Sequence, residues 1–333
     1  MKIIKELSQF KPPSAGTVLT IGNFDGVHLG HREMFRQVVN KAQELQASSA
    51  VLTFEPHPLR FLAPQRAPLR INTPQEKVRL IDASCIDLLL IIAFTREFAE
   101  LPPKRFVEEI LLEGLAMRCL IVGYDYAFGK NRQGNIDFLR EIAARRGFQL
   151  EVLPPISRGE LVYSSSRIRQ TILAGQVAEV VEVLGRNFTL DGVVVHGDGR
   201  GRNLGFPTAN LQTEKELLPC PGVYAVKVKW CARYFDAVVN LGRRPTFAGI
   251  ESRLEIHLLD FVGDLYGETL RLYFVERLRD EQRFASAEDL KTAVRVDVDK
   301  TRSILQGRQI VEYRDYLDCG DLAGGPCVDH EVN

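Results

Sequence analysis

The amino-acid sequence predicts an α/β protein in which an open parallel sheet is followed by an antiparallel β-barrel with a helix. Apolar runs of strand length alternate with amphipathic helical patterns as far as Gly185. Such alternation is typical of parallel sheets with right-handed crossovers. From Phe188 the pattern changes to short strands separated by Gly and Pro turns, which is typical of antiparallel barrels. We therefore predict domains at residues 1–186 and 187–317 and a flexible tail at 318–333.

Length and composition fit two soluble globular domains. The 333 residues are 45% hydrophobic and 26% charged, and 43 Lys and Arg balance 43 Asp and Glu. No basic surplus indicates a nucleic-acid partner, and no apolar run has the length of a membrane span or a signal-peptide core. The six cysteines form no C-x-x-C pair, which fits reduced thiols. We expect a cytoplasmic protein, monomeric or weakly homo-oligomeric, whose partners are small molecules and neither nucleic acid nor a membrane.

Residues 17–35, TVLTIGNFDGVHLGHREMF, form the most informative stretch. An apolar, β-branched strand breaks at Gly22 and turns into a helical pattern that carries His28 and His31. At such a helix start, unpaired backbone N–H groups and the helix dipole both favour an anion. Two histidines three apart share one helix face, and Gly30 between them leaves room for a bulky phosphate. The motif therefore predicts a nucleoside triphosphate site.

Two plainer interpretations of these histidines stay open. They can be capping or core residues, or they can be two ligands of a zinc site whose third ligand would be His57. The phosphate hypothesis is favoured because a strand, a glycine turn, a helix start and both histidines coincide in one short stretch.

The rest of the first half continues the alternation of helices and strands. In order, we expect a helix over 31–46, a strand ending in EPHP, a helix begun by the capping box of Thr73, Pro74 and Glu76, a central strand over 86–94, a helix over 106–112 that ends at Gly114, a strand over 119–123, a helix over 136–146 that ends at Gly147, and a strand over 148–154. Ligands bind beyond the carboxyl ends of parallel strands. The loops EPHP (55–58) and GYDYAFGKNRQG (123–134) should therefore converge with the histidine motif at one edge.

A further candidate site is SSSRIRQTIL, residues 164–173, which places hydroxyls at a helix start and adds Arg167 and Arg169. Serine hydroxyls in this position commonly cap the helix. A fixed guanidinium beside backbone donors also suits a leaving pyrophosphate, whose charge grows as the bond breaks. We favour the phosphate hypothesis because the first motif already indicates a triphosphate.

The second half changes to strands and one final helix. Strands are expected in FTLDGVVVHG, GVYAVKVKW, RYFDAVVNLG, SRLEIHLLDF and TLRLYFVERL, and Ser286 with Asp289 caps a helix that runs to about Leu305. The loop HGDGRGRNLGFPTANL, residues 196–211, lacks the G-x-G-x-x-G pattern and is followed by no helix, so it is no dinucleotide fingerprint. A glycine-rich loop beside a strand can still wrap phosphates with its backbone.

Three side chains of the second half are candidates for chemistry. Thr208 and Asn210 are neutral oxygen donors two apart, which suits Mg²⁺ carried in on ATP phosphates; alternatively they satisfy the backbone of a local turn. Glu255 is acidic among apolar neighbours and is a candidate general base if it faces a pocket; otherwise it is an ordinary outward-facing glutamate. In the tail, two cysteines and His330 are alternative donors for a metal.

Taken in order, these motifs resemble the bifunctional bacterial riboflavin kinase/FAD synthetases. The first half resembles their FMN adenylyltransferase module, a Rossmann-like nucleotidyltransferase sheet, through GNFDGVHLGH, TFEPHP, GYDYAFG and SSSRIR. The second half is similar to their riboflavin kinase module through GRNLGFPTANL, GVYAV, NLGRRPTF, LEIHLLDF, LYG and LRDEQRF. The resemblance spans residues 16 to about 317. It implies conversion of riboflavin and ATP to FMN, then of FMN and ATP to FAD and pyrophosphate.

The resemblance implies two sites. In the first, His28 and His31 stabilise the α-phosphate of ATP while the FMN phosphate attacks it in line. The further residues implied for the nucleotide are Gly22, Phe24, Asp25, Gly30, Ser165, Ser166 and Arg169. Of these, Ser165, Ser166 and Arg169 would hold the β- and γ-phosphates, and Arg169 would be catalytic. The residues implied for the flavin are His57, Asp125 and Phe128. Ser166 and Tyr126 stand where the family commonly has Thr and Phe, and each keeps the relevant hydroxyl or ring.

In the second site, the resemblance implies that Thr208 and Asn210 bind Mg²⁺ and ATP, with Gly201 and Pro207 on the nucleotide. Glu255 would take the proton from the ribityl 5′-hydroxyl of riboflavin. Two other functions stay open. One is nucleotide transfer to a different phosphorylated substrate with the barrel as an accessory, and the other is a non-catalytic flavin carrier.

Overall fold

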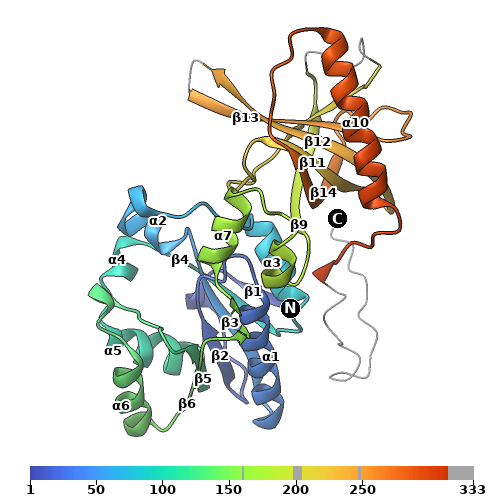
Figure 1. The fold of residues 1–333 in the computed structure, drawn as a ribbon. Coiled ribbons are helices and arrows are strands. Elements are labelled where there is room, and N and C mark those ends of the chain that lie inside the picture. The colour runs from blue at the N-terminus through green and yellow to red at the C-terminus, as the bar shows by residue number, and fades with distance from the viewer. Residues whose placement is uncertain (160, 198–204, 247–248, 314–333) are drawn as a thin grey trace. The chain divides into compact units, whose positions relative to one another are not determined.

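The structure is a computed structural model that describes residues 1–159, 161–197, 205–246 and 249–313. The chain forms two compact units (Figure 1). Among the described residues, one comprises Met1–Leu69 and Pro74–Ser164, and the other comprises Arg70–Thr73 and the chain from Ser165 to Tyr313. The parallel sheet lies in the first unit and the barrel lies in the second. Within the described residues, no helix combines the length and the apolarity needed to cross a bilayer.

Six parallel strands form the sheet of the first unit, in the order β1-β4-β3-β2-β5-β6. They are β1 (Lys2–Ile4), β2 (Thr17–Ile21), β3 (Ser48–Glu55), β4 (Leu88–Ala93), β5 (Met117–Gly123) and β6 (Gln149–Leu153). The predicted parallel sheet is confirmed, and β1 is an edge strand that the sequence pattern did not predict. Because β2 and β5 are neighbours without being consecutive, the strand order reverses between them, and open α/β sheets bind ligands at such a point.

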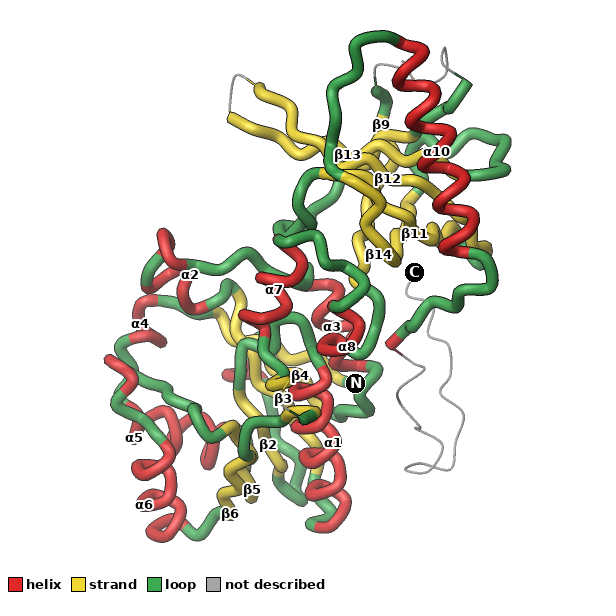
Figure 2. Tube along the Cα trace, viewed as in Figure 1, coloured by secondary structure: helices red, strands yellow, loops and turns green. Residues whose placement is uncertain are grey.

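Helices cover both faces of this sheet (Figure 2). On one face, α1 (Leu29–Glu44) packs on β2, β3 and β5, and Sδ of Met34 lies 3.0 Å from Oγ1 of Thr20. The other face packs on helices that follow β4 and β5 in a core that includes Leu19, Leu52, Leu111 and Leu139. The remaining elements of this unit are α2 (Pro58–Leu62), α3 (Pro74–Asp82), α4 (Arg96–Ala99), α5 (Pro103–Arg105), η3 (Phe106–Gly114), α6 (Ile136–Arg146), the short 3₁₀ turns η1 (Leu7–Gln9), η2 (Pro64–Arg66) and η4 (Lys130–Arg132), and the hairpin β7 (Ser157–Arg158) and β8 (Leu161–Val162).

Two predicted helix ends had different outcomes. Gly147 adopts the left-handed conformation after α6, with φ 77°, as a glycine C-cap requires. Gly114 was predicted to be the C-cap of its helix, and this is wrong by one residue, because Gly114 is the last residue of η3 and Leu115 is the C-cap. The segment is π-helical, and its i→i+5 hydrogen bonds place one more residue in the turn than the 3.6-residue spacing used for the prediction.

Six antiparallel strands close the barrel of the second unit, in the order β10-β13-β12-β11-β14-β9. They are β9 (Phe188–Val195), β10 (Ala209–Gln212), β11 (Gly222–Trp230), β12 (Arg233–Thr246), β13 (Gly249–Leu258) and β14 (Thr269–Arg279), preceded by α7 (Ser165–Leu173) and α8 (Val180–Leu184). The predicted barrel is therefore confirmed. α10 (Ala287–Leu305) runs across β11, β12 and β14 (Figure 1), and Ser286 caps it by accepting the N–H of Asp289 at 3.1 Å, as predicted.

Candidate active sites

His28 and His31 lie at the carboxyl end of β2, beside the point where the strand order reverses. His28 stands immediately before α1 in an extended conformation, and its side chain makes no capping hydrogen bond. The capping alternative is therefore wrong for His28. The two imidazoles stack, with ring centroids 3.6 Å apart and planes inclined by 23°. The described part of the first unit thus presents a stacked histidine pair at the carboxyl edge of its sheet.

The loop that delivers this pair is conformationally unusual. Phe24 (φ 46°), Gly26 (φ 91°) and Val27 (φ 39°) all have positive φ, which for a non-glycine residue costs about 1–2 kcal/mol. Such conformations persist only where the surroundings impose them, and they concentrate at functional sites. The ring of Phe24 stands edge-on to His31, with centroids 5.3 Å apart. The strained loop therefore sets where His31 lies.

Two glycines make room for these rings. A Cβ at Gly22 would lie 3.0 Å from the Phe24 ring, and a Cβ at Gly30 would lie 3.1 Å from the His28 ring. The sequence pattern had assigned the space beside Gly30 to a phosphate, and in the structure the imidazole of His28 lies next to that space. Asp25, also predicted at this site, is buried within the same loop.

The candidate flavin residues follow the neighbouring strands. Phe128 comes after β5, stacks on Tyr126 at 5.4 Å and packs against Phe106 at 5.3 Å. Burial raises the pKa of the Tyr126 phenol, so this group stays neutral. Ring contacts continue from Phe106 to Phe98 of α4, and from there to Phe94 and Phe54 at the ends of β4 and β3. Asp125 is exposed in the same loop after β5.

His57 has a structural task that the sequence did not predict. It stands before α2, and its Nδ1 accepts the backbone N–H of Leu59 at 3.2 Å, which caps the helix. Across the described residues, no group of three or more His, Cys, Asp or Glu side chains is arranged to hold a metal ion. Within the described residues, the two stacked histidines therefore have no third ligand with which to form a zinc site. The tail residues, His330 included, lie outside that described part of the chain.

Ser165 and Ser166 open α7 and Arg169 follows within the helix. All three belong to the unit that carries the barrel, whereas the histidine pair belongs to the first unit. Ser166 is exposed and Arg169 is half-buried. Their helix is held by a buried apolar side, formed by Ile168 and Ile172.

In the second unit, one row of register-paired residues, polar except for Val223, crosses the outer face of the barrel; we call it the polar row. Glu255 of β13 is the register partner of Asn210 on β10 and of Asn240 on β12. Directly paired residues of antiparallel strands point to the same face, so these three side chains lie together. The row continues through Val223 of β11 to Arg279 of β14. Its position on the outer face follows from alternation, because the next residue, Ile256, is fully buried inside the barrel.

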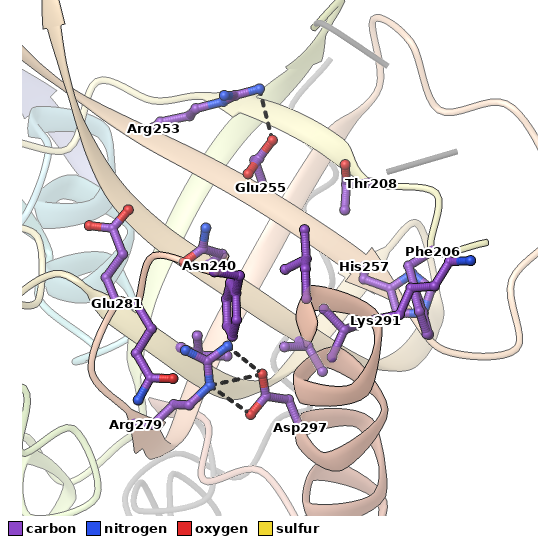
Figure 3. Close-up of a pocket in the computed structure, with 16 residues that line it drawn as sticks. Phe206, Thr208, Asn240, Arg253, Glu255, His257, Arg279, Glu281, Lys291 and Asp297 are labelled. Atoms are coloured by element: carbon purple, nitrogen blue, oxygen red, sulfur yellow. Dashed lines mark hydrogen bonds and ion pairs between the residues drawn. The ribbon is translucent and has the colours of Figure 1, made fainter. Parts of the chain in front are cut away.

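A pocket of about 330 Å³ lies over this row, between the barrel and α10. Figure 3 shows Glu255 in the pocket wall beside Arg253 and Thr208. Nη2 of Arg253 lies 2.8 Å from Oε1 of Glu255, and both side chains are largely covered. Sequence reasoning had left open whether Glu255 faces a pocket, and the structure places it in one. The sequence analysis missed Arg253 and Asn240, because their positions depend on strand register.

The described end of the predicted nucleotide loop, at Pro207, lies against the same strand. Nδ1–H of His257 donates to the carbonyl of Pro207 at 2.9 Å. Gly197 approaches Asn210 so closely that a Cβ on it would overlap the amide group. Thr208 and Asn210 thus offer a hydroxyl and an amide oxygen next to the Glu255 carboxylate, and this donor set fits Mg²⁺ that arrives with phosphates. Gly201, also predicted here, lies outside the described residues.

A buried ion pair holds α10 over the pocket. Asp297 of α10 accepts Nε and Nη2 of Arg279 at 2.8–3.1 Å, and the Asp297 side chain is only 4% exposed (Figure 3). Neither residue stands out in the sequence, because an aspartate in a polar helix carries no sign of burial. The pair therefore ties the helix that covers the pocket to β14.

Replacing Asp297 with Asn should lower the free energy of unfolding of the barrel unit by about 3 kcal/mol, because removing one partner leaves a buried charge uncompensated. Urea unfolding followed by tryptophan fluorescence measures this directly, since the single tryptophan, Trp230, lies in the barrel. Asp260→Asn is the matched control, because Asp260 pairs with Arg302 of the same helix in the open. Equal losses in the two variants would contradict the prediction.

The fold and the two candidate sites fit one class of protein: a two-module enzyme that transfers phosphorus-containing groups from a nucleotide. Comparison with known proteins agrees. A family model described as FAD synthetase matches residues 11–167, and one described as riboflavin kinase matches residues 184–305. The bifunctional riboflavin kinase/FMN adenylyltransferase of Pseudomonas fluorescens is 39% identical over 91% of this chain and 98% of its own length. The Escherichia coli (strain K12) protein of the same name is 38% identical, over 89% of this chain and 96% of its own length.

The chain belongs to the bifunctional riboflavin kinase/FMN adenylyltransferase family. The FAD synthetase module comes first and the riboflavin kinase module second, in the order that the motifs predicted, so the resemblance is confirmed. A crystal structure of a macrolide-efflux protein from Streptococcus pneumoniae shares the fold, with a TM-score of 0.81, 31% identity, and coverage of 90% of this chain and 98% of that one. The match of the barrel to riboflavin kinase argues against the accessory-barrel alternative.

Proposed function

We propose that each module carries its own set of reacting groups, with the boundary between modules at residues 186 and 187. Riboflavin kinase makes FMN from riboflavin and ATP, and FMN adenylyltransferase makes FAD and pyrophosphate from FMN and ATP. We further propose that the chain works in the cytoplasm on small molecules, without nucleic acid or membrane partners, as a monomer or weak homo-oligomer. Residues 318–333, which we expect to be a tail, lie outside the described residues.

For the kinase reaction, Glu255 accepts the proton of the ribityl 5′-hydroxyl as that oxygen attacks the γ-phosphorus of ATP, and the bond from this phosphorus to the β,γ-bridging oxygen breaks to release ADP. The polar row supports this assignment, because it puts the carboxylate between two amide side chains in the wall of a pocket. Thr208 and Asn210 would hold Mg²⁺ with the ATP phosphates, beside Pro207 and Gly201. Bound there, Mg²⁺ supplies neutralisation of phosphate charge, which with positioning is most of what phosphoryl transfer requires.

For the adenylyl transfer, an oxygen of the FMN phosphate attacks the α-phosphorus of ATP, and the bond to the pyrophosphate oxygen breaks. His28 and His31 donate hydrogen bonds to the α-phosphate as its charge develops. Their stacking on one edge of the sheet supports this role. The nucleotide also contacts Gly22, Phe24, Asp25 and Gly30; Ser165, Ser166 and Arg169 hold the β- and γ-phosphates; His57, Asp125 and Phe128 face the flavin. The aromatic series that includes Phe128 offers flat surfaces of the kind on which a flavin ring stacks.

The observation that carries the proposal is the presence of two separately built polar sites, one in each module. Incubation of the purified chain with riboflavin, ATP and MgCl₂, followed by chromatography, should show FMN first and FAD afterwards. Chelation with EDTA should stop both products, and excess Mg²⁺ should restore them. FAD formation that continues in EDTA would contradict the proposed magnesium requirement, and flavin binding without ATP consumption would favour the carrier alternative.

A further inference from the structure

Lys77 lies outside every motif that the sequence singled out, yet it reaches the loop that carries the histidine pair. Its Nζ donates to Oγ1 of Thr53 at 3.3 Å and to the carbonyl of Asn23 at 3.4 Å. Oε2 of Glu55 lies 4.0 Å from the same ammonium group, whose side chain is 13% exposed. One side chain from α3 thereby joins the end of β3 to the loop after β2.

Thr53 strengthens the same contact. Its side chain is fully buried, and its Oγ1 donates to the Asn23 carbonyl at 3.3 Å. The Asn23 carbonyl therefore accepts hydrogen bonds from two side chains that come from two different elements, β3 and α3. Because Thr53 is buried, its hydroxyl acts on the protein and not on a substrate.

The anchored peptide directly precedes the strained part of the loop. Asn23 is followed by Phe24, whose backbone is left-handed and whose ring packs on His31. A positive φ at a large aromatic residue must be imposed by its surroundings. The two hydrogen bonds to Asn23 are such a restraint, and the ammonium group suits this purpose because a charged donor binds a carbonyl more strongly than a neutral one.

We propose that Lys77 is a positioning residue of the adenylyl-transfer site. Together with Thr53 it fixes the Asn23 carbonyl and so maintains the loop conformation that presents His31 and its stacked partner. The inference rests on the proposed function of the histidine pair. Lys77 acts through the loop and need not touch ATP or FMN.

The test compares Lys77→Met and Thr53→Val, each of which removes one donor to Asn23. Both should lower kcat for FAD formation from FMN by about 10-fold to 100-fold, because misplacing a catalytic group by about 1 Å has effects of that size. KM for ATP should stay close to wild type. The double variant should lose little more than either single variant, because both act on the same carbonyl. Lys77→Arg keeps a charged donor and should recover much of the rate.

Lys41→Met is the matched control. Lys41 is a similarly covered lysine of the same unit, and it pairs with Glu44 and Glu151, so its loss should leave FAD formation unchanged. Far-UV circular dichroism checks folding. If Lys77→Met does not fold, Thr53→Val, which keeps the side-chain shape, and Lys77→Arg carry the comparison.

Three results would overturn the proposal: an unchanged kcat in Lys77→Met or Thr53→Val, a raised KM for ATP at unchanged kcat, or additive losses in the double variant. The double replacement of His28 and His31 by Ala separates the two levels of inference. If that variant still makes FAD, the proposed function of the histidine pair fails. If it loses FAD formation while Lys77→Met retains it, only the role of Lys77 fails.

Discussion

FAD formation from FMN should fall by about 10³-fold or more when His28 and His31 are both replaced by Ala, since removing even one preorganised donor commonly costs 10²- to 10³-fold. The two rings stack at 3.6 Å on one edge of the sheet, so they act as a unit on one phosphate. Water that fills the space of a deleted ring would not stabilise the phosphate equally well, because the loop holds the two rings in place before substrate binds. Chromatography of FAD from added FMN and ATP measures the loss.

The second module supplies the control for this variant within the same chain. Its reacting groups lie in the barrel, on strands that share no residue with the loop after β2. FMN formation from riboflavin should therefore continue, and FMN should accumulate. Loss of both activities in a folded double variant would show that the two sites are not separate, and retained FAD formation would show that the histidines do not bind the α-phosphate.

The features that sequence predicted correctly are local ones. The strand, glycine turn and helix that carry the histidines lie within 19 consecutive residues, 17–35, and each is marked by residue type. The cap at Ser286 and the left-handed Gly147 were also predictable, because each depends on one side chain or on the absence of one. For such features the neighbouring residues in the chain contain the cause.

The features that it missed depend on register or on distant contacts. Glu255 meets Asn240 only because of how β12 and β13 pair, and an offset of one residue would turn each side chain to the opposite face. Lys77 and Asn23 are separated by 54 positions and meet through the sheet. Gly114 shows a third cause, a π-helical winding that a 3.6-residue pattern does not represent. The local sequence does not state which strands pair in which register, which distant residues meet, or how tightly a helix is wound.

Replacing Glu255 with Gln should have the opposite effect to the histidine variant. FMN formation should fall by about 10²- to 10⁴-fold, the usual contribution of a general base, while FAD formation from added FMN continues. Gln keeps the shape and a hydrogen-bonding oxygen toward Arg253 but has no proton-accepting carboxylate. The remaining hydrogen bonds of the pocket wall are therefore preserved, and the loss reports on proton transfer.

The matched control is Glu276→Gln, because Glu276 lies on β14, half exposed, near Arg308 and outside the pocket. It removes one carboxylate from the same barrel and should leave both activities near wild type. The comparison decides between two explanations of a loss in Glu255→Gln. If Glu276→Gln is equally impaired, the barrel responds to net charge or stability; if only Glu255→Gln is impaired, the carboxylate acts on the riboflavin hydroxyl. FMN formation that survives in Glu255→Gln would mean that ATP and the positioning groups suffice without a base.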